Sequence, residues 1–173
     1  MQGDGFERAK KMTAAEIAEL DAGGEEEDPA APSADAVPLA LPFARRGIPV
    51  VGVEPSCLLT LRDEAKAVLP TPDTDAVAAR ALLFEEFLAA ERAAGRLRLP
   101  LGPVRWRKAL LHGHCHQKAL GAFGAVEQVL RMIPGLEVST IAATCCGMGG
   151  AFGYHAEHHE ISMRIGESGV LPA

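Results

Sequence analysis

The sequence lacks any apolar run approaching the about 20 residues that a membrane-spanning helix needs. Its N-terminus, Met-Gln-Gly-Asp-Gly-Phe-Glu, also lacks the basic stretch followed by an apolar stretch that is typical of a signal peptide. These two absences predict a protein without a transmembrane segment. We expect it in the cytoplasm, where a peripheral complex at the inner face of the cell membrane is compatible with the sequence.

Several nucleotide-binding and catalytic motifs are also missing. The chain contains no Gly-x-Gly-x-x-Gly, no Gly-x-x-x-x-Gly-Lys and no Gly-x-Ser-x-Gly. It therefore offers no recognisable means of binding NAD, FAD or ATP, and no nucleophile of the serine-hydrolase type. Any redox function would consist of passing electrons.

Basic residues are too few to form a nucleic-acid surface. The formal net charge is −6, and residues 1–35 hold ten Asp or Glu against three Lys or Arg, so the remainder is near +1. Nucleic-acid binding needs a basic face. We therefore expect no nucleic-acid partner.

The length of 173 residues and a hydrophobic content of 48% are enough for one substantial core. Thr13 and Glu16 have the spacing of a capping box for a short helix ending near Ala22. Residues 23–35 consist mainly of Gly, Pro, Ala and acidic residues and show no apolar periodicity. This composition is typical of a disordered linker. The sequence thus predicts an acidic tail over residues 1–36 and one folded domain over residues 37–173.

Apolar, β-branched segments in this domain alternate with helical patterns. Strands are predicted over residues 48–53, 108–112 and 136–142. Helices are predicted over residues 37–46, from 58 to the prolines at 70 and 72, from about 74 to 95, 117–132 and 155–167. In the third helix Val77, Ala81, Phe84 and Leu88 form an apolar stripe. This order favours an α/β fold, a layered parallel sheet with flanking helices joined by right-handed crossovers.

The chain has only four cysteines, and each lies at a turn that follows a predicted strand and precedes a predicted helix: Cys57, Cys115, Cys145 and Cys146. If the strands are parallel neighbours, the four sulfurs meet at the carboxyl edge of one sheet. In a reducing compartment cysteines serve as metal ligands or redox pairs more often than as disulfides. Helix N-termini at these turns would lower the thiol pKa values and offset the charge of an anionic cluster.

Neighbouring residues add to this pattern. Gly147 can supply the positive φ that a Cys-Cys pair needs to bind one centre, and the glycines at 149 and 150 allow close backbone approach. His114 and His116 could replace a cysteine as zinc ligands, or they hydrogen-bond locally or to cluster sulfur. Glu54 is expected to hydrogen-bond the turn that presents Cys57.

Taken together, these motifs resemble the C-terminal cysteine-rich CCG domain of FAD-linked 2-hydroxy acid oxidoreductases, such as the iron–sulfur subunit of glycolate oxidase and D-2-hydroxyglutarate-type dehydrogenases. The segments that carry the resemblance are residues 52–64, 112–119, 145–154 and 165–173. The resemblance implies an electron path from a reduced flavin through iron–sulfur centres to a respiratory acceptor. It further implies that the four cysteines bind an iron–sulfur cluster, of the 4Fe–4S type, while FAD lies on a partner domain.

The sequence also departs from that family. No Cys-x-x-Cys follows Gly147, and the flavin domain, the ferredoxin-like cysteine runs and a second CCG half are missing. We therefore expect a fragment or a stand-alone remnant that docks on a flavoprotein and is not catalytic alone. Two alternatives are open. One is a zinc-binding structural or docking domain that uses some of the cysteines with His114 or His116, and the other is a scaffold whose cysteines are free thiols or pair when oxidised.

Overall fold

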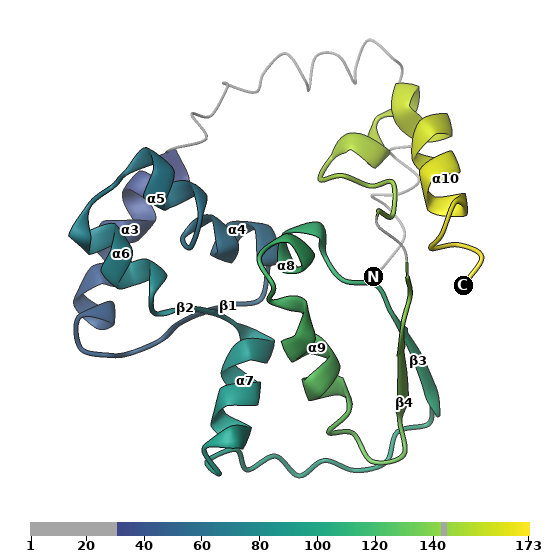
Figure 1. Cartoon of the computed structure of the whole chain (residues 1–173), viewed down its shortest axis with the longest axis horizontal. Coiled ribbons are helices and arrows are strands. Elements are labelled where there is room, and N and C mark those ends of the chain that lie inside the picture. The colour runs from purple at the N-terminus through teal and green to yellow at the C-terminus, as the bar shows by residue number, and fades with distance from the viewer. Residues whose placement is uncertain (1–30, 143–144) are drawn as a thin grey trace, which may run out of the picture.

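The computed structural model describes residues 31–142 and 145–173, with side chains from residue 36 (Figure 1). The predicted helix at residues 13–22 and most of the predicted linker lie outside these residues. The described part mixes helices with short parallel strands, as the α/β prediction requires.

The strands form two parallel pairs. β1 (Val50–Gly52) pairs with β2 (Ala81–Leu83), and β3 (Lys108–Leu111) pairs with β4 (Glu137–Thr140). Within the described residues these pairs are separate two-stranded sheets, where the sequence predicted one layered sheet. The strands predicted over residues 108–112 and 136–142 are found as β3 and β4, and their pairing is parallel, as predicted for the sheet.

β2 lies where the sequence predicted the middle of a helix. The observed elements are α6 (Pro72–Ala78), β2 and α7 (Phe84–Ala93), so the predicted apolar stripe is split between two helices and a strand. Two interactions explain the split. β2 pairs with β1, and the Glu86 carboxylate accepts a hydrogen bond from the backbone N–H of Leu83 at 2.9 Å, which starts α7 anew.

The remaining helices also differ from the prediction at their ends. α3 (Ala31–Ala44) begins before the predicted start at Val37 and contains both Pro38 and Pro42. The predicted helix after residue 58 is divided into α4 (Pro55–Thr60) and α5 (Glu64–Val68). The predicted helix over residues 117–132 is divided at Gly121, which has φ +70°, into α8 (Cys115–Ala119) and α9 (Phe123–Leu130).

The C-terminal segment comprises two 3-10 turns, η1 (Phe152–Tyr154) and η2 (Ala156–His158), followed by α10 (His159–Glu167).

The core of the described residues lies between α3, α4, α6 and the β1–β2 pair. Leu59, Val77 and Leu83 are fully buried, and Leu58 joins them from α4. Each such side chain contributes about 1.5–3 kcal/mol when fully buried. This packing fixes α4, and therefore the residues at its start, against the carboxyl end of β1. No helix among the described residues is long and apolar enough to cross a membrane.

Candidate cysteine site

Cys57 lies in the first turn of α4, directly after β1. Glu54 caps this helix, and its Oε2 accepts a hydrogen bond from the backbone N–H of Cys57 at 2.5 Å, which confirms the predicted role of Glu54. Gly52 lets α4 pack closely on β1, because a Cβ there would lie 2.9 Å from Leu58 Cδ1. The Cys57 side chain is exposed. Its backbone is therefore held by the cap while its sulfur faces outward.

The electrostatics of this turn differ from the prediction. The hydrogen bond from the Cys57 backbone lowers the pKa of Glu54. Conversely, a hydrogen bond from the Cys57 thiol to Glu54, the charge of that carboxylate and partial desolvation raise the pKa of Cys57. The prediction that the helix N-terminus lowers the thiol pKa is wrong at this position. The physical reason is that a capping carboxylate binds the free amide and places a negative charge beside the sulfur.

Cys115 is the first residue of α8 and follows β3 through a three-residue turn. His114 caps α8, because its Nδ1 accepts from the backbone N–H of His116 at 3.2 Å. The backbone N–H of His114 in turn donates to Oε1 of the buried Gln117 at 3.2 Å. Gly113 is required by packing, since a Cβ there would lie 2.3 Å from the Phe123 ring. Cys115 itself is exposed.

The turns that carry Cys57 and Cys115 lie against each other. Ser56 Oγ and His114 Nε2 are 3.4 Å apart, and α4 contacts α8 (Figure 1). Because Nδ1 of His114 accepts the cap hydrogen bond, Nε2 of the neutral ring carries the proton and donates to Ser56. Both ring nitrogens of His114 therefore have protein partners. The local hydrogen bonding predicted as one role for His114 is confirmed.

Cys145 and Cys146 form a turn on the surface of α10. Gly147 has φ +90°, as predicted, and its backbone N–H lies 3.4 Å from Cys145 Sγ. A Cβ at Gly147 would lie 2.1 Å from the backbone oxygen of Ser162. A Cβ at Gly166 would similarly lie 3.2 Å from the backbone oxygen of Cys146. The pair is thus packed against two α10 residues, and both cysteines are partly buried.

The histidines near α10 have structural contacts. His155 precedes η2, and only His159 belongs to α10, so the predicted single helix from 155 to 167 is shortened at its start. His158 stacks on Phe152 with ring centroids 4.1 Å apart, and its Nδ1 lies 3.2 Å from the Phe152 backbone oxygen. These contacts hold η1 and η2 together.

The sequence reasoning missed His112, which it treated as a strand residue. Both ring nitrogens of His112, and Nδ1 of His116, are buried without a hydrogen-bond partner in the part of the chain that the structure describes. Burial, with a smaller effect from the Lys118 charge, lowers the pKa of His112. The signal was available in the motif His-Gly-His-Cys-His, which places His112 beside the Cys115 turn. A neutral imidazole with unpaired nitrogens can bind a ligand that the protein itself does not supply.

The four cysteines therefore form two groups. Cys57 and Cys115 lie at adjoining helix starts. The turn that contains Cys145 and Cys146 instead packs against α10, and Figure 1 shows α10 apart from α4 and α8. Over residues 31–142 and 145–173, no group of three or more His, Cys, Asp or Glu is placed to hold a metal ion. As placed, the residues do not fit one cluster bound by four cysteines. Coordination by all four stays a prediction.

Comparison with known proteins relates the chain to dehydrogenases. It is 33% identical over 121 residues to one of the subunits of anaerobic glycerol-3-phosphate dehydrogenase from Escherichia coli strains K12 and O157:H7, and the match covers 70% of this chain and 30% of that relative. It is 32% identical over 127 residues to D-2-hydroxyglutarate dehydrogenase of Escherichia coli strain K12. This match covers 72% of this chain and 12% of that enzyme. No family model and no solved structure matches.

These relatives support the predicted relation to oxidoreductases. One is a dehydrogenase and the other is part of a dehydrogenase, and the chain spans less than a third of either. Similarity to D-2-hydroxyglutarate dehydrogenase agrees with the resemblance to 2-hydroxy acid oxidoreductases, whereas the sequence motifs did not predict similarity to a glycerol-3-phosphate dehydrogenase. Assignment to the CCG domain stays a prediction.

Proposed function

We propose that the chain is an iron–sulfur electron-transfer domain that relays electrons from a flavin-dependent dehydrogenase partner to a respiratory acceptor. The observation that carries the proposal is the contact of Ser56 with His114, which brings the helix starts bearing Cys57 and Cys115 together. The relatives support it, because both are dehydrogenases or their subunits. The missing nucleotide-binding motifs favour a relay rather than hydride transfer.

In this proposal Cys57, Cys115, Cys145 and Cys146 bind one cluster, which supplies one-electron transfer. The two groups of cysteines would have to approach each other when it binds. Glu54 and His114 cap α4 and α8 and so set the direction of their cysteines. Gly147 gives the Cys-Cys pair the backbone conformation that allows neighbouring thiolates to face one centre.

The proposal is tested by iron and acid-labile sulfide content, with visible absorption, of protein purified under argon. We expect both iron and sulfide in the wild type and their loss in Cys145→Ser and Cys146→Ser. His158→Ala is the matched control, since His158 packs in the same segment but is no proposed ligand. Full iron content in both cysteine variants would contradict the ligand assignment.

The partner follows from the same proposal. The glycerol-3-phosphate dehydrogenase relative is, by its name, one of several subunits of an enzyme. We infer that a flavoprotein chain or domain docks on this one and that the flavin, rather than this chain, meets the hydroxy acid or a related substrate. Reduction of the bound cluster by substrate only when the flavoprotein is present would support this arrangement, and reduction by substrate without it would oppose it.

A zinc-binding docking domain is the second candidate. It is favoured by the unpartnered Nδ1 of His116 and the two unpartnered nitrogens of His112, which flank the Cys115 turn in the described part of the chain. Stoichiometric zinc without visible absorption would support it. His116→Ala separates the two candidates, because it should remove zinc from a mixed Cys and His site but leave a four-cysteine cluster at full iron content.

A further inference from the structure

A long connection without helix or strand joins α7 to β3. It comprises residues 94–107, and its stretch from 96 to 104 has neither regular structure nor turns. Connections of this length within a folded domain are uncommon and are often functional. Figure 1 shows it along the edge of the molecule where α7 and α9 end. We call it the α7–β3 connection.

Both ends of the connection are held by backbone hydrogen bonds. The backbone N–H of Arg96 donates to the Glu91 oxygen at 2.9 Å, and the Arg107 oxygen accepts from the backbone N–H of Glu137 at 2.8 Å. Between residues 98 and 106, one backbone–backbone hydrogen bond is found within the described structure. The middle of the connection can therefore adapt its shape while its ends stay fixed to the domain.

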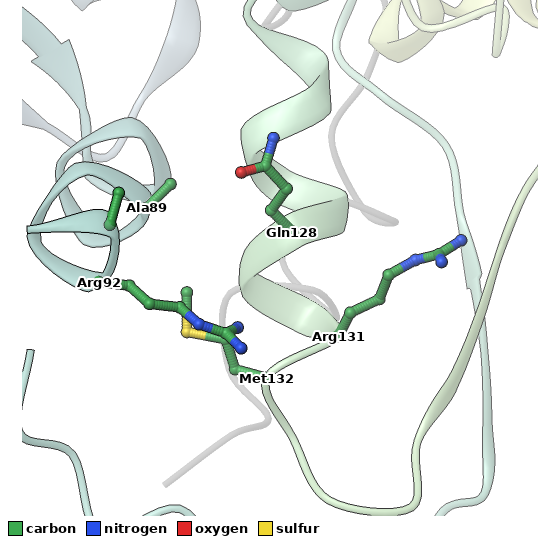
Figure 2. A pocket seen from close by; sticks show the side chains of 6 residues that line it. Ala89, Arg92, Gln128, Arg131 and Met132 are labelled. Carbon is green, nitrogen blue, oxygen red and sulfur yellow. The ribbon is translucent and has the colours of Figure 1, made fainter. Parts of the chain in front are cut away.

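The first part of the connection lies over the ends of α7 and α9. Leu97, Leu99 and Leu101 line a hollow of about 190 Å³ together with Arg92 and Met132. Figure 2 shows the side chains of Arg92 and Met132 next to each other, one from each helix end. The leucines thus hold the connection beside a cation without filling the space between them.

The connection exposes several large apolar side chains. Leu99, Val104 and Trp106 are 48%, 46% and 60% exposed, and Leu101 is 43% exposed. Exposed apolar residues are normal when they occur singly, whereas these four fall within eight positions. The Arg105 guanidinium carbon lies 4.8 Å from the centre of the Trp106 ring. Tryptophan favours the boundary between water and hydrocarbon, because its ring is apolar and its N–H is polar.

The same connection is rich in cations that lack an ion-pair partner. Residues 92–108 contain six Lys or Arg and no Asp or Glu. Arg96 pairs with Glu91. Glu137 lies in register with Lys108 on the next strand but makes no ion pair with it. Five cations are therefore without an ion pair in the part of the chain that the structure describes: Arg92, Arg98, Arg105, Arg107 and Lys108.

We propose that the α7–β3 connection binds the surface of a membrane that contains anionic lipids. Arg98, Arg105 and Arg107 bind lipid phosphate groups, and Trp106 enters the layer between the headgroups and the acyl chains. Each Lys or Arg held near an anionic surface strengthens such binding about fivefold. Burial of the exposed apolar side chains adds to this attraction. The proposal is independent of the cysteines and of the function proposed above.

A lipid surface fits these residues better than a protein surface does. A second copy of the chain would place the same five unpaired cations against each other. A folded partner would need a rigid surface of matching shape, and the middle of the connection has too few backbone hydrogen bonds to provide one. A bilayer interface accepts apolar side chains at different depths and offers phosphate groups wherever the cations lie.

Vesicle binding by the full chain tests the proposal, and Trp106 is the natural probe because it is the single tryptophan of the chain. With vesicles of equal parts phosphatidylglycerol and phosphatidylcholine, we expect the protein to sediment with the lipid. The Trp106 emission should move to shorter wavelength and be quenched by brominated phosphatidylcholine. Vesicles of phosphatidylcholine alone should bind several-fold less. Absence of binding to the anionic vesicles, or binding that leaves the Trp106 emission unchanged, would overturn the proposal.

Charge variants show whether the connection is the binding surface. Arg105→Gln together with Arg107→Gln should weaken binding to the anionic vesicles about 25-fold, at about fivefold for each cation removed. Arg46→Gln together with Arg80→Gln is the matched control, because both arginines are exposed, lie outside the connection and carry the same charge. This control should bind as the wild type does. Equal losses in the two double variants would mean that the vesicles respond to net charge, which would contradict the proposal.

The apolar contribution is tested separately by sedimentation. Trp106→Ser should weaken binding several-fold, whereas Tyr154→Ser, which removes another exposed aromatic ring, should not. Unchanged binding in Trp106→Ser would show that the ring does not enter the lipid. Soluble polyglutamate distinguishes an acidic protein from a membrane. If polyglutamate shifts the Trp106 emission and anionic vesicles do not, the connection binds an acidic protein and the proposal fails.

Discussion

Ser56 Oγ lies 3.4 Å from His114 Nε2, and this contact joins two turns that are far apart in the sequence and belong to different sheets. The cysteines next to these residues, Cys57 and Cys115, are thereby brought to adjoining helix starts. A contact between exposed side chains of this kind is worth about 1 kcal/mol or less. Its importance lies in orientation rather than in stability.

Ser56→Ala should loosen the two turns without unfolding the protein. We expect a short bis-maleimide to crosslink Cys57 to Cys115 more slowly in this variant than in the wild type, because the helix starts separate more often. Mass spectrometry of the linked peptides measures the rate. Thr60→Val is a suitable control, since it removes an α4 hydroxyl whose hydrogen bond, within the described residues, goes to the Ser56 backbone oxygen. Equal rates in the Ser56→Ala variant and the wild type would show that the contact holds nothing in place.

Glu54→Gln should make Cys57 more reactive. A carboxylate accepts a hydrogen bond from the Cys57 thiol and adds a negative charge beside it, and both raise the pKa of the thiol. The amide can still accept the hydrogen bond from the Cys57 backbone, but it is a weaker acceptor for the thiol and carries no charge. More thiolate is then present at neutral pH, and iodoacetamide should react faster. Cys115 is an internal control in the same digest. If iodoacetamide reacts with Cys57 at the same rate in Glu54→Gln as in the wild type, the carboxylate charge does not govern the reactivity of this thiol.

Glu54 should also make stability depend on pH. The pKa of its carboxyl is lowered in the folded protein, so its contribution is fully present above the pKa of the unfolded chain and is lost as pH falls through the lower folded value. Glu54→Ala should therefore cost about 1 kcal/mol at neutral pH, as for other helix caps, and less in acid. Urea unfolding at several pH values measures the difference, with Glu160→Ala as an exposed control. A cost that is the same at every pH would argue against the charged cap.

Gly147→Ala should be much more harmful than Gly150→Ala. Both glycines have positive φ, but a Cβ at Gly147 would lie 2.1 Å from the Ser162 backbone oxygen, whereas a Cβ at Gly150 would meet nothing within 4 Å among the described residues. Backbone strain alone costs about 1–3 kcal/mol at either position. The collision adds to it at Gly147 only, so the free energy of unfolding should fall further there. Similar losses in the two variants would mean that the turn is not packed on α10.

The parts of the fold that depend on local chemistry were predictable. The Glu54 cap and the positive φ of Gly147 follow from residues close in sequence, and both are found. β2 was missed because Ala81, its first residue, fits the helical spacing of Val77, Phe84 and Leu88. Only pairing with β1, about thirty residues earlier, decides in favour of a strand.

The candidate site was predictable only in part for the same reason. That Cys57 and Cys115 follow strands could be read from apolar runs. The approach of their turns could not, because β1 and β3 belong to different two-stranded sheets and the turns meet through Ser56 and His114. The position of Cys145 and Cys146 depends on how η1, η2 and α10 pack, through contacts such as Phe152 with His158. The thiol pKa at Cys57 was predicted with the wrong sign, because the helix dipole was considered without the carboxylate that caps it.

The central claim is that all four cysteines bind one iron–sulfur cluster, and alkylation of protein prepared with and without iron and sulfide under argon tests it most directly. We predict that Cys57, Cys115, Cys145 and Cys146 all react with iodoacetamide in the metal-free protein and are all protected in the iron-loaded protein. Protection of Cys145 and Cys146 while Cys57 and Cys115 still react would contradict the claim, because it would show that the two groups never meet.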